Sequence, residues 1–266
     1  VLKNIGDYTN AELAETFGHW NKGDDLQSFL IEITAKAFEK KDDQGPGDLI
    51  DVIQDQAGQK GTGKWTTISA LHYGVAIPTI TAAVDARIIS GSLDLRESKR
   101  PYTPDLEEPV PNKEKMRIMV RSALHLSTLC SYKQGFQLMK VASEEHNWQL
   151  NLSECARIWL GGCIIRSVLL KTFIDALSGD SAKEETASQY FEKQFSGEKQ
   201  VFWRQIQELS ASRGIPIPAI SASLSYYDAI RRDRLPQNLI QAQRDFFGAH
   251  TFTRTDKEGT YHAQWE

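Results

Sequence analysis

"GVAIPTITAAV" (residues 74–84) and "GIPIPAISASL" (residues 214–224) align without a gap at an offset of 140 residues and share Gly, Ile, Pro, Ile and Ala. At nearly the same offset, "SFLIE" (28–32) matches "SVLLK" (167–171) more weakly. No flexible linker separates the matching regions, so we predict two divergent halves packed around a pseudo-two-fold axis rather than two separable domains. The alternative is that Gly-x-x-Ile-Pro is only a common pattern at helix starts.

Helical signals dominate the rest of the chain. Thr9 and Glu12 form a capping-box pattern, in which each side chain satisfies a backbone donor at a helix start. "DDLQSFLIEITAKAFEKK" (24–41) places Leu26, Phe29, Leu30, Ile33 and Ala37 on one face at the helical period. Further helices are predicted at 65–74, 78–97, 113–147, 152–178, 184–212, 216–234 and 236–247, with an exposed proline-rich loop at 98–114.

The last part of the chain has a different pattern. Residues 250–265 alternate like two short strands around a turn from Asp256 to Gly259. We therefore predict an all-α fold with a short irregular or β-like C-terminal tail. The predicted division is a helical domain at 1–247 and a tail at 248–266.

Composition excludes several classes of protein. The 266 residues carry a net charge of −4, which argues against a general nucleic-acid binder. The three cysteines have no C-x-x-C spacing, so neither a disulfide framework nor a zinc site is indicated, and a cytoplasmic location is predicted. Arg166 and Lys171 interrupt the most apolar stretch (158–174), so no membrane span is predicted. The sequence shows no signal peptide pattern either. The chain opens at Val1 on a segment typical of a helix end, so we expect it to be part of a longer protein.

The glycine-rich loop "GQKGTGKW" (58–65) comes within one residue of the nucleotide-binding pattern G-x-x-x-x-G-K-[S/T]. Trp65 stands where the Mg²⁺-binding hydroxyl belongs, and the preceding segment looks helical where a true P-loop follows a strand. Nucleotide binding is therefore disfavoured.

The same loop still suits a simpler anion site. Gly58, Gly61 and Gly63 allow backbone amides to approach an anion, Lys60 and Lys64 add positive charge, and Thr62 adds a hydroxyl. From composition alone, a glycine-rich turn with solvated lysines is equally compatible.

Two further basic positions are candidates for ligand contact. Arg87 lies on a helix of small and apolar residues, where it needs either a carboxylate of its own chain or a ligand anion. Gly248 is predicted to cap a helix, after which the chain turns and brings His250 back towards Arg244. Such a pair suits a phosphate or carboxylate, although His250 alone is more often a surface or cap residue. The other histidines show no metal-ligand spacing, and no G-x-G-x-x-G loop occurs, so neither a metal nor a dinucleotide site is predicted in this chain.

Several strings together resemble the C-terminal part of the decarboxylating 6-phosphogluconate dehydrogenases, from about residue 2 to residue 252. They are "AGQKGTGKWT" (57–66), "GVAIP" (74–78) with "AVDARIIS" (83–90), "GGCIIRSVLL" (161–170), "LSYYDAIR" (224–231) and "LPQNLIQAQRDFFGAHTF" (235–252). The resemblance implies an all-helical domain of two related halves that forms much of a homodimer interface.

The resemblance also implies an activity for the complete protein. Family members convert 6-phosphogluconate and NADP⁺ to ribulose 5-phosphate, CO₂ and NADPH in the pentose phosphate pathway. Their catalytic lysine and glutamate, and their NADP-binding Rossmann domain, lie before the position that matches Val1. No catalytic residue is therefore predicted in this chain, which we expect to be inactive alone.

Five site residues carry over from the resemblance. Lys60, Thr62 and Arg87 match the family's contacts to the substrate phosphate within one subunit, and Arg244 and His250 match contacts that reach in from the other subunit. Many members continue into a long Gly/Ser-rich tail against the partner, which this chain lacks, so that contact is in doubt. The alternative function is a non-catalytic helical dimerisation scaffold.

Overall fold

The structure is a computed structural model that describes residues 1–97 and 109–265, apart from the Glu97 side chain. The chain forms two compact units, Val1–Leu224 and Ser225–Glu266, and each is described by itself. Most of the predicted proline-rich loop, residues 98–108, lies outside the described residues. The predicted division at residue 247 stays a prediction.

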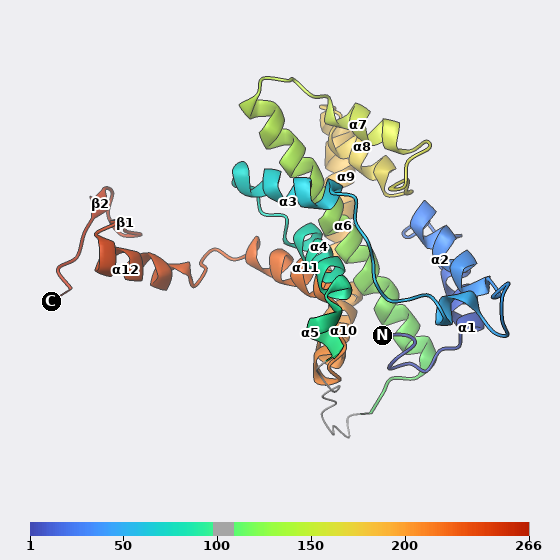
Figure 1. Cartoon of the computed structure of the whole chain (residues 1–266). Helices are drawn as coiled ribbons and strands as arrows, with labels where there is room; N and C mark the ends of the chain where they lie inside the picture. The colour runs from blue at the N-terminus through green and yellow to red at the C-terminus, as the bar shows by residue number, and fades with distance from the viewer. Residues whose placement is uncertain (98–108, 266) are drawn as a thin grey trace. The chain divides into compact units, whose positions relative to one another are not determined.

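The described residues confirm the all-α prediction, since strands form only one two-stranded sheet among them (Figure 1). The elements are α1 (Asn10–Trp20), α2 (Phe29–Glu39), the short 3₁₀ helix η1 (Leu49–Asp51), α3 (Thr62–His72), α4 (Pro78–Gly91), α5 (Leu93–Glu97), α6 (Lys113–Glu145), α7 (Leu152–Trp159), α8 (Leu170–Ala176), α9 (Ser181–Phe195), α10 (Glu198–Ser212), α11 (Pro218–Ala229), α12 (Gln237–Gly248), β1 (Phe252–Thr253) and β2 (Thr260–Tyr261). Within this part of the chain, no helix combines the length and apolar character that a membrane span needs.

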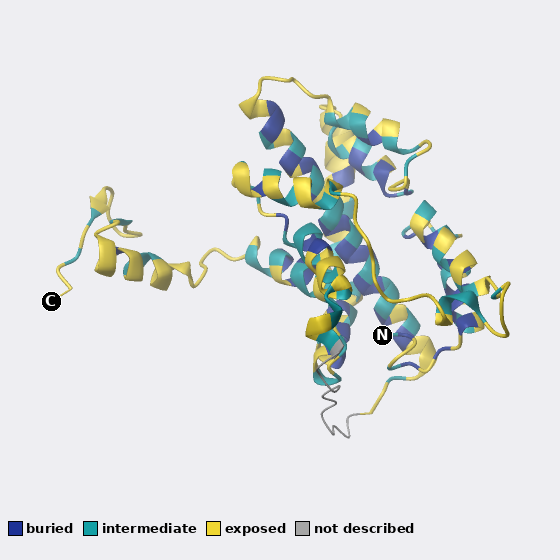
Figure 2. Cartoon of the chain, viewed as in Figure 1, coloured by how far each residue is buried: buried dark blue, intermediate teal, exposed yellow. Residues whose placement is uncertain are grey.

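Helix α6 is the central element of the first unit. It is 33 residues long and begins at an Asn112 cap, whose side chain accepts a hydrogen bond from the Lys115 N–H at 2.9 Å. Met116, Ala123 and Leu126 of α6 are fully buried, because α4, α7 and α10 pack against this helix. Figure 2 shows the buried residues running along α6.

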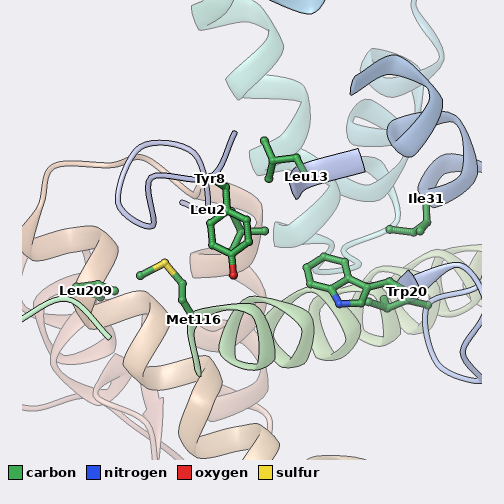
Figure 3. Close-up of a cluster of buried hydrophobic side chains, with 8 residues drawn as sticks. Leu2, Tyr8, Leu13, Trp20, Ile31, Met116 and Leu209 are labelled. Carbon is green, nitrogen blue, oxygen red and sulfur yellow. The ribbon is translucent and has the colours of Figure 1, made fainter. Parts of the chain in front are cut away.

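A hydrophobic cluster joins the N-terminal segment and α1 to the rest of the first unit (Figure 3). Its buried members come from the first residues of the chain, α1, the segment between α1 and α2, α2, α6 and α10; they are Leu2, Tyr8, Leu13, Trp20, Leu26, Ile31, Met116 and Leu209. The Thr9 and Glu12 capping box is present at the start of α1, as predicted. Burying these large side chains attaches α1 and α2 to α6.

The weak match between 28–32 and 167–171 marks a point where the two halves pair with each other. Ser28 and Ser167 form an isolated antiparallel bridge. The Phe29 N–H donates to the Arg166 carbonyl at 3.0 Å, and the Val168 N–H donates to the Gln27 carbonyl at 2.9 Å. The two bonds join equivalent positions reciprocally, as a two-fold axis requires.

The stronger repeat extends into the helices that precede it. α3 and α10 both end at a glycine with φ of 64°, Gly74 and Gly214. The Val75 N–H donates to the Ala70 carbonyl at 2.8 Å, and Ile215 repeats the bond to Ser210 at 2.9 Å.

The helices that follow the two glycines also meet. α4 and α11 each begin at a proline, and the Thr79 and Ser223 hydroxyls lie 2.8 Å apart between them. The similarity therefore reflects a repeated helix end, turn and helix start, which a helix-start pattern alone does not explain.

Three predicted helices are wrong in extent. The segment 78–97 is divided at Ser92, which ends α4 before α5 begins. The segment 152–178 is broken between α7 and α8, where Gly162 has φ of 67° and Ser167 leaves helical geometry to pair with Ser28. The segment 184–212 is broken at Gly197, whose φ is 79°. The helix expected before the glycine loop is only the short η1.

The predicted apolar face of α2 is not the buried one. Ile31 and Ala35 are buried, whereas Leu30 and Ile33 are exposed in this chain. This helix is apolar on more than one side, so periodicity could not choose between its faces.

Candidate functional site

The glycine loop leads directly into α3, whose N-cap is Gly61. Its φ of 112° is left-handed, a conformation that only glycine adopts without strain. The first backbone N–H groups of α3, beginning at Thr62, have no partner within the helix. Together with the helix dipole they make this end attractive to an anion.

The three loop glycines have different structural roles. A Cβ at Gly63 would lie 2.8 Å from Val84 Cγ2, so this glycine lets the first turn of α3 pack closely on α4. A Cβ at Gly58 would meet nothing within 4 Å. Gly61 supplies the turn, Gly63 supplies the close approach of two helices, and Gly58 leaves the loop surface open.

Arg87 of α4 lies against this loop and donates through Nη2 to the Gly58 carbonyl. Ser90, one turn later, accepts from the Ala57 N–H at 2.9 Å and donates to the Arg87 carbonyl at 2.7 Å. Helix α4 therefore holds the start of the loop through two side chains, and Arg87 is one of them.

Lys60 and Arg87 bring two positive charges to the loop. Within residues 1–97 and 109–265, neither Arg87 nor Lys60 forms an ion pair with a carboxylate. The side chains of Lys60, Thr62 and Arg87 are all exposed. The structure thus brings Arg87 to the loop of Lys60 and Thr62, with no described carboxylate to neutralise it.

A large cavity of about 1010 Å³ opens beside the loop, and Thr62 and Trp65 contribute to its wall. Most of its lining is apolar, including Leu30, Leu138 and Ile165. A phosphate needs charge-assisted hydrogen bonds, and Arg166, which lies in this lining, is already paired with Glu32 at 3.2 Å. Lys60 and Arg87, which have no carboxylate partner among the described residues, lie at the loop and not in the cavity lining.

Arg244 and His250 lie in the second unit, on and just after α12. Arg244 Nη1 donates to Gln241 Oε1 at 3.0 Å. The prediction that Gly248 caps the helix is wrong, because Gly248 is the last helical residue and Ala249, with φ of 48°, is the left-handed cap. The His250 ring folds back onto the helix end, where a Cβ at Gly248 would lie 2.8 Å from it. Gly248 is therefore needed to leave room for the His250 imidazole, whereas Ala249 makes the turn.

Asp245 is a buried carboxylate that the sequence reasoning did not select. Its side chain is 0% exposed and accepts from the Thr251 N–H at 2.9 Å, His262 Nδ1 at 2.9 Å, the Ala263 N–H at 3.1 Å and Trp265 Nε1 at 2.9 Å. Burial alone would raise the pKa of Asp245, but these hydrogen bonds outweigh it and lower the pKa to about 2. The ionised carboxylate therefore ties the tail to α12.

The tail forms the predicted pair of short strands. β1 and β2 are antiparallel, with Phe252 opposite Tyr261 and Thr253 opposite Thr260. No sequence motif marked Asp245, since its donors lie 6 to 20 residues further along the chain.

Comparison with known proteins gives a match over nearly the whole chain. The family model for the 6-phosphogluconate dehydrogenase C-terminal domain matches residues 1–265. Identity is 48% to the decarboxylating 6-phosphogluconate dehydrogenase of Synechococcus elongatus, 47% to the decarboxylating enzyme 1 of Oryza sativa subsp. japonica and 46% to the NADP(+)-dependent decarboxylating enzyme of Bacillus subtilis. Each match covers 100% of this chain but only 57%, 55% and 57% of the relative. The chain thus spans just over half the length of these curated relatives.

A solved structure agrees with these matches. The 6-phosphogluconate dehydrogenase of Plasmodium falciparum, described in apo form and in complexes with NADP+ and with 6-phosphogluconate, superposes with a TM-score of 0.90 at 43% identity. The superposition covers 99% of this chain and 57% of that one.

Proposed function

The chain belongs to the 6-phosphogluconate dehydrogenase family, as its C-terminal domain, and from this premise we propose that it binds the phosphate end of 6-phosphogluconate within a homodimeric, NADP-dependent decarboxylating enzyme. The relatives carry the names of decarboxylating dehydrogenases. Because this chain spans just over half of their length, the activity is proposed for the complete protein.

One observation carries the proposal: Arg87 is held on the glycine loop without a carboxylate partner among the described residues. A guanidinium held on the loop, together with Lys60 and the free amides at the start of α3, supplies the kinds of donor that a phosphate requires. A phosphate ester carries close to two negative charges at pH 7, so charge-assisted hydrogen bonds from this surface would hold it strongly.

Arg244 and His250 are proposed to complete the site from the partner subunit. Support comes from α12, on which Leu239, Ile240 and Phe247 are exposed although they are large and apolar. Figure 2 shows how much of α12 is exposed. Apolar residues gathered on one short helix are typical of an interface.

NADP is proposed to be held by residues outside this chain, because the residues present do not fit a dinucleotide. The sequence has no G-x-G-x-x-G loop, and the sheet that residues 1–97 and 109–265 form is a two-stranded hairpin without a parallel pair. When bound, NADP would accept the hydride from the substrate. The residues of this chain would bind and orient the phosphate, while the proposed lysine and glutamate that move protons lie outside it.

The first test uses the complete protein with Lys60→Ala and Arg87→Ala. Each variant removes a charge-assisted hydrogen bond, so KM for 6-phosphogluconate should rise by about 10- to 100-fold while kcat changes little. Lys171→Ala is the matched control, because Lys171 is an exposed lysine of α8, outside the loop, with no ion pair among the described residues, and its removal should leave KM nearly unchanged. A KM that stays at the wild-type value in both site variants would contradict the proposal.

The second test uses the chain alone. It should not reduce NADP⁺ in the presence of 6-phosphogluconate, and measurable reduction would refute the claim that the proton-transfer residues lie elsewhere. A complete protein that binds no 6-phosphogluconate in a calorimetric titration would instead indicate a dimerisation scaffold. A cytoplasmic location is also proposed, with the free thiols of Cys130, Cys155 and Cys163 in support.

A further inference from the structure

The residues on either side of His250 both have left-handed backbone conformations. Ala249 has φ of 48° and Thr251 has φ of 62°. A β-branched residue such as Thr251 seldom adopts positive φ, because its Cβ crowds the following carbonyl. Strained residues of this kind persist only where their surroundings hold them, and they gather at functional sites.

Two side chains of α12 hold the backbone of Thr251. Asp245 Oδ1 accepts from the Thr251 N–H at 2.9 Å, and Gln241 Nε2 donates to the Thr251 carbonyl at 2.6 Å. The Thr251 hydroxyl adds a bond to the His250 carbonyl at 2.6 Å. Both backbone polar groups of the strained residue are therefore occupied, and its conformation is fixed from the helix.

The same two side chains reach beyond Thr251. Gln241 Oε1 also accepts from Arg244 Nη1 at 3.0 Å, so one amide orients Arg244 and holds the corner that carries His250. Asp245 binds His262 and Trp265 of the tail, which close over the carboxylate and keep water from it. A buried, ionised acceptor holds its donors more firmly than a solvated one.

We propose that Gln241 and Asp245 are positioning residues for phosphate binding: they fix the strained corner 249–251 so that His250 and Arg244 are presented together. The inference rests on the proposed function, in which Arg244 and His250 contact the phosphate. Without the two side chains the corner relaxes to an unstrained conformation and the imidazole moves away from its binding position. Presenting the pair in advance avoids the entropic cost of ordering it on binding.

The test compares two glutamines of α12 in the complete protein. Gln241→Ala removes both bonds of the bridging amide but leaves Asp245 and the tail in place. Gln243→Ala is the matched control, because Gln243 is an exposed residue of the same helix with no hydrogen bond described. We expect Gln241→Ala to raise KM for 6-phosphogluconate about tenfold, with kcat within about twofold of wild type, and Gln243→Ala to change neither.

A second variant tests the strain directly. Thr251→Gly keeps the backbone N–H and carbonyl of residue 251, and glycine adopts positive φ without strain. In the Gln241→Ala background this change should therefore recover part of the lost affinity for 6-phosphogluconate. A general loss of structure would not be rescued by an added glycine. Asp245→Asn, which puts an amide NH₂ among N–H donors, should raise KM at least as much as Gln241→Ala.

Variants of Arg244 and His250, the two residues proposed to contact the phosphate, distinguish a failure of the proposed function from a failure of the positioning inference. If Arg244→Ala and His250→Ala leave KM unchanged, the proposed function of this pair is wrong. If those two raise KM while Gln241→Ala matches Gln243→Ala, the phosphate contacts stand and the positioning inference is overturned. Rescue by Thr251→Gly together with a tenfold effect of Gln241→Ala supports it.

Discussion

Replacing Gly63 with alanine tests whether α3 can pack closely on α4 only because residue 63 has no side chain. The new Cβ would lie 2.8 Å from Val84 Cγ2, closer than Cβ contacts occur. Val84 is only 9% exposed, so its side chain has little room to rotate. Overpacking of this kind costs about 1–3 kcal/mol. Alanine in place of a helical glycine stabilises by about 0.5–1 kcal/mol, so the net loss is about 1 kcal/mol and at most about 2.5 kcal/mol.

Gly18 provides the matched control, because it lies inside α1 and a Cβ there meets nothing within 4 Å. Gly18→Ala should therefore stabilise the chain by about 0.5–1 kcal/mol. The assay is urea unfolding at a fixed protein concentration, since self-association would otherwise change the apparent stability.

A double-mutant cycle makes the Gly63 result specific. Val84→Ala alone removes two buried methyl groups and should cost about 1.6 kcal/mol. It also removes the atom that clashes, so the Gly63→Ala, Val84→Ala pair should lose less than the sum of the single changes by the overpacking cost, about 1–3 kcal/mol. Strictly additive losses, or a Gly63→Ala chain as stable as Gly18→Ala, would refute the packing argument.

The remaining predictions concern buried and strained groups. Burial, assisted by the charge of Lys199, lowers the pKa of His125 to about 4, whereas the unfolded histidine titrates near its usual 6.5. Between these values only the unfolded chain takes up the proton, so stability should fall by about 3 kcal/mol as pH drops from 6.5 to 4, and His125→Gln should flatten the profile measured by urea unfolding. Ala249→Gly should stabilise the protein by about 1 kcal/mol in the same assay, because it relieves a left-handed alanine, while Ala242→Gly inside α12 should destabilise it by a similar amount. Equal effects of the two glycines would contradict the conformational reason, and a pH profile identical in His125→Gln would contradict the buried-histidine reason.

Local signals predicted the parts of the fold that depend on neighbouring residues. The Thr9 cap, the long α6 and the end strands all follow from patterns within a few positions. The repeat at 74–84 and 214–224 predicted the pairing of the halves, because each copy has the same helix end and proline start. At the break between α7 and α8, the pair Gly161 and Gly162 was a local turn signal that the helical prediction passed over, whereas the pairing of Ser167 with Ser28 in the other half could not be read locally.

The residues of the candidate site were likewise predictable only where they form a local sequence pattern. Gly61 and Lys60 stand out in the sequence because a loop of glycines and lysines is a local pattern. Gly63 was chosen for backbone access to an anion, yet its contact with Val84 gives it a packing role that only the fold reveals. Gln241 and Asp245 were missed because a glutamine and an aspartate on an exposed helix have no distinctive spacing, and their partners lie in the folded tail.

The central claim is that this chain recognises the phosphate of its ligand through the loop and Arg87. The most direct measurement is calorimetric titration of the complete protein, wild type and Arg87→Ala, with 6-phosphogluconate and with gluconate, which lacks the phosphate. We predict that Arg87→Ala weakens 6-phosphogluconate binding by about tenfold or more and leaves gluconate binding unchanged, so that the preference for the phosphorylated ligand shrinks. An undiminished preference for 6-phosphogluconate in Arg87→Ala would contradict the claim.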